Sequence, residues 1–304
     1  MRTDARRRVR LFASAALLAV VSCSTEAAEH SHSHSDVDPS GVMGEPGDVH
    51  SGPQGSVGQF VAECAYSHSA PDDPIVYPGE PGRSHLHDFF GSRSASADST
   101  VESLRGSETS CDLAADTASY WSPSVFVDGV QVKPLAATAY YRPAVDVDPA
   151  KVVAYPDGLA MIAGDQSATS AQPVGIVGWS CGGSSRRTAE PPRCTPDAML
   201  RLDVTFPDCW NGVDLDVPGH RRHLHYSIDG ECPNSHPIHV PQLTFSVTYP
   251  LHGDVLGLRL ASGEPRTAHA DFLNAWDPTR LETEVALCIR GQAVCGISDG
   301  RVEG

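Results

Sequence analysis

The chain has 304 residues and is acidic, with 38 aspartates and glutamates, 22 lysines and arginines, and a formal net charge of -16. Beyond the amino terminus its basic residues are scattered, so no basic stripe is available to neutralise phosphates, and the sequence indicates no nucleic-acid partner. No later segment is apolar for long enough to cross a membrane.

The amino terminus has the pattern of a signal peptide. MRTDARRRVR is basic, LFASAALLAVV is apolar but too short to span a bilayer, and small residues follow. The run ends in VVSC, which places Cys23 where a lipoprotein signal peptidase would cut and a lipid would be attached. We therefore expect an extracellular protein that a lipid on Cys23 anchors to the cell membrane, with plain secretion as the alternative.

Composition predicts the domain organisation. After a signal peptide at 1–22, residues 23–58 are rich in Ser, Gly, Pro, Asp and His and indicate a flexible tether, which includes the segment HSHSHSD. Alternating histidines can capture metal, although a solvated polar tail is the simpler interpretation. Residues 59–296 are expected to form one β-rich domain, and residues 297–304 a tail.

The nine cysteines fit an exported protein. If Cys23 carries a lipid, eight remain, and an even number in this compartment indicates disulfides. No two of the eight have the CxxC spacing of a zinc ribbon or a thioredoxin-type site. The first pairs to test are the local ones, Cys181 with Cys194, Cys209 with Cys232, and Cys288 with Cys295.

Short β segments dominate the pattern, and Gly, Pro and Asp interrupt them at short intervals. These segments are SVFVDGVQV, KVVAY, PVGIVGWSC, MLRLDVTFP, TFSVTYP and DVLGLRL. VFVDGVQV predicts a hairpin with its turn at Asp128 and Gly129. The expected fold class is mainly β, an antiparallel β-sandwich or jelly-roll-like domain with long loops and a short helical C-terminal part.

The helical part is expected in AHADFLNAWDPTRLETEVALCI. Phe272, Leu273 and Trp276 could form an apolar stripe on a first helix, which Pro278 would end. A second helix is expected from about Thr279 to Ile289.

GRSHLHDFFG, at residues 82–91, carries the strongest site signal. In a strand, His85 and His87 would project from one face and could offer two imidazoles to one metal, while Asp88 would point away. Two adjacent imidazoles repel each other when protonated, so the pair favours a functional role over a structural one.

GHRRHLHY supplies further histidines. If the segment is extended, His223 and His225 share a face, whereas a turn or helix would pair His220 with His223. HPIH adds His236 and His239, which could equally belong to a rigid structural turn. We predict a divalent metal, Zn or Cu, on His85, His87, His223 and His225.

Acid–base chemistry is a second use of the same residues. Tyr141 and Arg142 in AYYRP could serve proton transfer and carboxylate pairing beside the histidines, which gives His85, His87, His220, His223, Tyr141 and Arg142 as candidate catalytic residues. The acids Asp208, Asp214 and Asp216 could serve glycoside hydrolysis. The chain lacks GxSxG, Walker, GxGxxG and HExxH motifs, so the enzyme classes that need them are not indicated.

Seven motifs together resemble one known family. They are DPIVYPGEPGRSHLHDFFG, YWSPSVFVDG, AYYRP, YPDGLAMIAGD, FPDCWNGVDLD, GHRRHLHY and CPNSHPIHVPQL, in this order from about Asp73 to Tyr249. The order is similar to that of a secreted family of fungal and actinobacterial proteins catalogued as a domain of unknown function. The resemblance implies an extracellular protein, and some fungal members are joined to carbohydrate-binding WSC modules.

Two functions remain open from the sequence. The first is a glycan-active enzyme, of the lyase or hydrolase type, acting on a polysaccharide or envelope glycan with the histidines as acid, base or metal ligands. The second is a non-catalytic surface protein that binds glycan or metal. An enzyme requires histidines that converge in a cleft beside free polar groups, whereas a binder tolerates a closed metal site.

Overall fold

The computed structural model describes residues 51–52, 55–56, 58–182 and 186–296. The expected signal peptide, the lipid site at Cys23 and the HSHSHSD segment lie outside the described residues. Within the described part, none of the helices is both long and apolar enough to cross a membrane.

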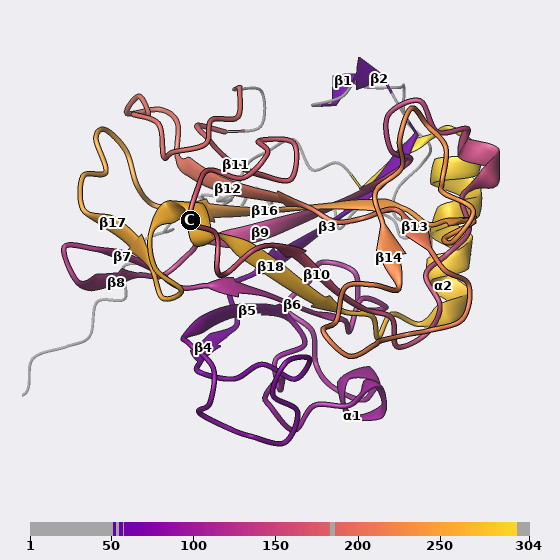
Figure 1. The fold of residues 1–304 in the computed structure, drawn as a ribbon, viewed down its shortest axis with the longest axis horizontal. Coiled ribbons are helices and arrows are strands. Elements are labelled where there is room, and N and C mark those ends of the chain that lie inside the picture. Colours follow the sequence, from indigo (N-terminus) through magenta and orange to yellow (C-terminus); the bar gives the residue numbers. More distant parts are fainter. Residues whose placement is uncertain (1–50, 53–54, 57, 183–185, 297–304) are drawn as a thin grey trace, which may run out of the picture. The chain divides into compact units, whose positions relative to one another are not determined.

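A five-stranded antiparallel sheet forms one layer of the domain (Figure 1). Its strands follow the order β10-β18-β6-β5-β4. They are β10 (Ala160–Gly164), β18 (His269–Leu273), β6 (Ser119–Pro123), β5 (His87–Gly91) and β4 (His68–Ala70).

A six-stranded sheet forms the second layer, in the order β11-β12-β16-β9-β3-β19. Its pairings are antiparallel except that β19 runs parallel to β3. The strands are β11 (Val177–Ser180), β12 (Leu200–Thr205), β16 (Gln242–Tyr249), β9 (Ala136–Arg142), β3 (Gln59–Ala65) and β19 (Val294–Cys295).

The main core lies between these two sheets, because alternate residues of each strand point inward. Tyr120 of β6 stacks on Phe245 of β16 with ring centroids 5.5 Å apart, and Phe272 of β18 lies 4.9 Å from Tyr120. The domain is therefore an antiparallel β-sandwich, which confirms the expected fold class.

Shorter elements complete the described part. Small sheets form in the orders β14-β13-β15, β17-β7-β8 and β1-β2. The strands are β1 (Ser51–Gly52), β2 (Gly55–Ser56), β7 (Val125–Val127), β8 (Val130–Val132), β13 (Cys209–Trp210), β14 (Leu224–His225), β15 (Ile238–His239) and β17 (Leu258–Leu260). The helices are α1 (Val101–Arg105), α2 (Pro278–Glu284), the 3-10 turns η1 (Pro149–Lys151) and η2 (Pro265–Thr267), and the π-helical η3 (Val285–Arg290).

Local sequence signals succeed where the turn chemistry is strong. The hairpin of β7 and β8 is confirmed, and its turn residues Asp128 and Gly129 both have positive φ, at 50° and 80°. The second C-terminal helix is confirmed as α2 continued by η3. The first is wrong, because residues 269–273 form the buried strand β18 of the five-stranded sheet.

Four disulfides join the eight cysteines of the described part. The three expected local pairs are confirmed, and the fourth joins Cys64 to Cys111. Each bridge closes a loop that would otherwise add conformational freedom to the unfolded chain, and removing such a bridge typically costs about 2–5 kcal/mol.

Gly91, the last residue of β5, provides a test of the sheet geometry. Its φ is 79°, and a Cβ added there would lie 2.1 Å from the carbonyl oxygen of Ala118. Gly79 has a similar φ of 74° but no neighbouring atom within 4 Å of an added Cβ. Gly91→Ala should therefore lower the free energy of unfolding by about 1–3 kcal/mol more than Gly79→Ala, measured by urea denaturation. Equal losses would show that the chain does not approach Gly91 this closely.

Candidate functional site

The candidate site lies on the outer face of the five-stranded sheet. Strand alternation places His87 and Phe89 on this face, while Asp88 and Phe90 face the other way. Asp88 accepts hydrogen bonds from Ser69 and Ser124 at 2.6 and 2.7 Å, so it points away from His87, as expected. The segment 71–86 covers the outer face, since its Ile75 packs in one buried cluster with Phe89.

Three imidazoles meet under this cover. His87 begins β5, His85 lies two residues before it, and His269 comes from β18, on the far side of β6. Ring centroids lie 4.2 Å apart for His85 and His87, 5.1 Å for His85 and His269, and 5.8 Å for His87 and His269. One ligand nitrogen of each histidine lies within 4.8 Å of the others, so the three could bind one metal ion.

Hydrogen bonds fix the tautomers of two of these rings. The Nδ1–H of His87 donates to the carbonyl oxygen of Asp72 at 2.9 Å, and that of His269 donates to the carbonyl oxygen of Thr267 at 3.0 Å. Because a carbonyl can only accept, each neutral ring keeps a lone pair on Nε2. This arrangement is the one that metal-binding histidines commonly use.

Two carboxyl groups join the cluster. Asp271 lies two residues after His269 on the same face of β18, and ligand atoms of Asp73, His87 and Asp271 also lie within 4.8 Å of one another. One oxygen of Asp73 accepts from the backbone N–H groups of Ile75 and Val76, which fixes its direction. The site therefore offers both nitrogen and oxygen ligands.

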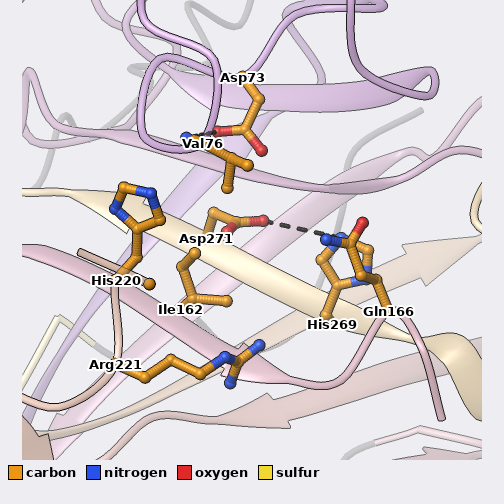
Figure 2. Close-up of a pocket in the computed structure, with 9 residues that line it drawn as sticks. Asp73, Val76, Ile162, Gln166, His220, Arg221, His269 and Asp271 are labelled. Carbon is orange, nitrogen blue, oxygen red and sulfur yellow. Dashed lines mark hydrogen bonds and ion pairs between the residues drawn. The ribbon is translucent and has the colours of Figure 1, made fainter.

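Several buried polar atoms of the cluster have no hydrogen-bond partner. They are Nε2 of His85, Nε2 of His87 and both carboxyl oxygens of Asp271, which is 1% exposed. One Asp271 oxygen lies 3.9 Å from Nε2 of His269, the contact drawn as a dashed line in Figure 2, which is too long for a hydrogen bond. Buried polar groups in native proteins are nearly always paired, and a buried unpaired carboxyl group is costly. Their convergence on one point indicates a ligand, and a cation would satisfy all of them together.

Burial keeps the imidazoles neutral. It lowers the pKa of His85 to about 4 and that of His269 to about 3, and it lowers the pKa of His87 well below its usual value. Burial also raises the pKa of Asp73 and, strongly, that of Asp271, where the neighbouring Asp73 adds to the effect and Arg221 opposes it. Neutral imidazoles are the form that binds a metal.

A cavity of about 230 Å³ opens onto the cluster (Figure 2). Its walls combine groups from the two sheet strands with groups from two loops. The lining residues are Asp73, Val76, Ile162, Gln166, Gly219, His220, Arg221, His269 and Asp271.

His220 presents a second reactive group to this cavity. Its Nδ1–H donates to the carboxylate of Asp216 at 2.9 Å, which leaves Nε2 as the acceptor of the neutral ring. The backbone of His220 has a φ of 56°, in the left-handed region that few non-glycine residues adopt. Such backbone conformations cluster at functional sites.

The other histidines of the sequence prediction lie outside the three-imidazole cluster. His223 is buried and its Nε2–H donates to the carbonyl oxygen of Ala160 at 2.7 Å, while His225 is exposed beside His236. Neither occurs in the ligand groups found among the described residues. His239 lies 3.2 Å from the sulfur of Cys232, which is already bonded to Cys209.

Tyr141 and Arg142 are buried elsewhere in the sandwich. Tyr141 is buried in the main core, where its ring stacks on Phe60 at 4.5 Å and its hydroxyl contacts Tyr120. Arg142 points to the opposite face of the six-stranded sheet and lies over the ring of Tyr140 at 5.1 Å. The structure thus brings His85, His87 and His220 to one region, and separates Tyr141 and Arg142 from it.

His269, Asp271, Asp73 and Arg221 are the site residues that the sequence interpretation missed. The sequence did carry a signal for His269 and Asp271, because they are two residues apart, as His85 and His87 are, and would project from one face of a strand.

The fold and site define a class of protein, a disulfide-stapled β-sandwich with an imidazole and carboxyl cluster on the outer face of its five-stranded sheet. Residues 73–276 match the family model described as "Domain of unknown function (DUF1996)". This match covers more than half of the sequence, so the chain belongs to that family. Neither the curated proteins nor the solved structures contain a match to the chain.

Proposed function

We propose that the chain is an exported, metal-dependent enzyme that acts on a polysaccharide or envelope glycan by metal-assisted hydrolysis. The observation that carries the proposal is the convergence of unpartnered buried atoms from His85, His87 and Asp271 with the Nε2 lone pair of His269. With three imidazole ligands, and with Asp271 hydrogen-bonded to the metal's water, the metal would keep one open position, which is typical of a catalytic site, whereas structural sites are closed by four protein ligands.

The residues divide the chemistry between them. His85, His87 and His269 would hold a divalent metal, for which the donor set suits Zn, Cu or Fe, and Asp73 and Asp271 would accept hydrogen bonds from its water. A metal bound there would lower the pKa of that water. His220, oriented by Asp216, would accept the water's proton as the water oxygen bonds to the substrate carbon. Solvent would supply a proton to the leaving oxygen as the old bond breaks, and His220 would then pass its own proton to solvent.

Export and membrane attachment belong to the same proposal. The signal-peptide pattern and the VVSC sequence support attachment through a lipid on Cys23, and four disulfides fit an oxidising compartment. A glycan of the cell envelope would then be within reach of the domain.

Metal binding is the first expected result. The full chain with His30, His32 and His34 changed to serine should bind one zinc ion per molecule, which excludes capture by the HSHSHSD segment. His85→Ala and His87→Ala should each weaken zinc binding about 100-fold or more, because each removes one of three imidazole ligands. The exposed His225→Ala is the matched control and should bind zinc like the parent. Zinc content after dialysis, with circular dichroism to confirm folding, measures this.

Catalysis is tested on the same zinc-loaded sample. The sample is incubated with acidic and neutral polysaccharides and should release products. A chelator should abolish this release, and added zinc should restore it. Zinc binding without product release would instead support the non-catalytic metal-binding protein.

A further inference from the structure

We propose that the cavity takes an acidic saccharide and that Arg221 binds its carboxylate. This inference rests on the proposed function, because it names the substrate class of the same site.

The geometry of Arg221 suits carboxylate binding. Its guanidinium lines the cavity and is anchored by one bond, from Nη2 to the carbonyl oxygen of Gly164 at 2.5 Å. Among the described residues it forms no ion pair and no other hydrogen bond. An anchored guanidinium with free N–H groups is pre-organised to bind a planar carboxylate with two parallel hydrogen bonds.

The charges in the cavity favour an anion once the metal is bound. Among the residues that line the cavity, a divalent cation and Arg221 would carry more positive charge than the carboxylates of Asp73 and Asp271 can neutralise, while the carboxylate of Asp216, outside the lining, is hydrogen-bonded to Nδ1 of His220. The chain as a whole carries a formal charge of -16, so a positive cavity is a local feature. Such a feature attracts and orients an anionic group that the rest of the surface repels.

The remaining walls suit a sugar ring. Val76 and Ile162 give an apolar surface for its C–H groups, and the amide of Gln166 and Nε2 of His220 can bond to hydroxyl groups. In Figure 2, His220 lies at the left, Arg221 below it, Asp271 at the centre, and His269 and Gln166 at the right. The cavity has a volume of about 230 Å³, so the ligand that it holds is expected to be roughly one sugar unit in size.

The experiment is calorimetric titration of the zinc-loaded full chain with sodium D-glucuronate, D-glucose and sodium acetate. Glucuronate should bind at least tenfold more tightly than glucose or acetate, because only glucuronate combines the carboxylate with the hydroxyl groups. Arg221→Gln should weaken glucuronate binding at least tenfold. Arg222→Gln should leave it within twofold of the wild type, because Arg222 is exposed like Arg221 but does not line the cavity.

Each other outcome overturns the inference. If the wild type and Arg221→Gln bind glucuronate equally, or if neither binds it, Arg221 does not bind the carboxylate. If acetate binds as tightly as glucuronate, the sugar ring contributes nothing to binding, and the saccharide part of the inference is wrong. Zinc content is measured on every sample beforehand, so a zinc-loaded chain that ignores glucuronate refutes only this inference, whereas a chain without zinc refutes the proposed function as well.

Discussion

Replacing Trp276 by alanine is expected to lower the free energy of unfolding by about 3–5 kcal/mol. The Trp276 ring is fully buried and makes edge contacts with Phe60 and Tyr141, both at 5.9 Å between centroids. Its indole N–H lies 3.2 Å from the hydroxyl of Tyr141 and 3.3 Å from that of Tyr120. The alanine variant would leave a cavity and remove the indole donor to these two hydroxyls. Urea denaturation followed by fluorescence measures the loss.

Two further variants separate the loss of the indole N–H from the loss of the buried ring. Trp276→Phe keeps an aromatic ring but removes the N–H, so it should cost less than Trp276→Ala. Trp210→Ala is the matched control, since Trp210 is only partly buried in a small sheet. A similar loss for Trp210→Ala and Trp276→Ala would contradict the central position of Trp276 in the core.

The second large effect is a loss of stability with rising pH that depends on Asp116. Its carboxyl group is fully buried and accepts from the Tyr120 hydroxyl at 2.7 Å and the Ala118 N–H at 3.2 Å. Burial, with a smaller contribution from Asp112, raises the pKa of Asp116 from 3.8 to about 8, because the two hydrogen bonds only partly oppose it. The folded chain therefore keeps a proton on Asp116 at pH values where the unfolded chain has lost it.

This difference in pKa between the folded and unfolded chain makes the free energy of unfolding fall as the pH rises. A carboxyl group with a raised folded-state pKa contributes most stability below the unfolded pKa, and the contribution is lost as pH rises toward the folded pKa. Between pH 5 and pH 7 the wild type should lose about 1.4 kcal/mol for each pH unit relative to Asp116→Asn. Urea denaturation of both proteins at each pH measures this loss. Asp98→Asn, at an exposed aspartate, is the matched control variant. Parallel stability curves for the wild type and Asp116→Asn would contradict a protonated Asp116.

The fold was predictable where local chemistry decides it. Asp128 and Gly129 alone specify the hairpin turn, and short sequence separations were enough to pair Cys181 with Cys194. The segment HADFL was interpreted as helix because Phe272 and Trp276 have helical spacing. Its strand conformation depends on pairing with β6 and β10, which are distant in sequence. Pairing of that kind overrides local spacing.

The site was predictable in part for the same reason. The HxH pattern places His85 and His87 side by side whatever the rest of the chain does. Their third neighbour depends on strand order, because β6 separates β5 from β18 and brings His269 over the same face. Sequence alone offered His223 and His225 as equally plausible partners. Arg221 was passed over because the sequence does not show which of the two adjacent arginines, Arg221 or Arg222, lines a cavity.

The most direct test of the three-imidazole metal centre is anomalous diffraction from a crystal of the zinc-loaded protein. The proposed centre requires one zinc peak about 2.0–2.1 Å from Nε2 of His87, Nε2 of His269 and a ring nitrogen of His85. A peak at His225 and His236, with none between these three rings, would contradict it.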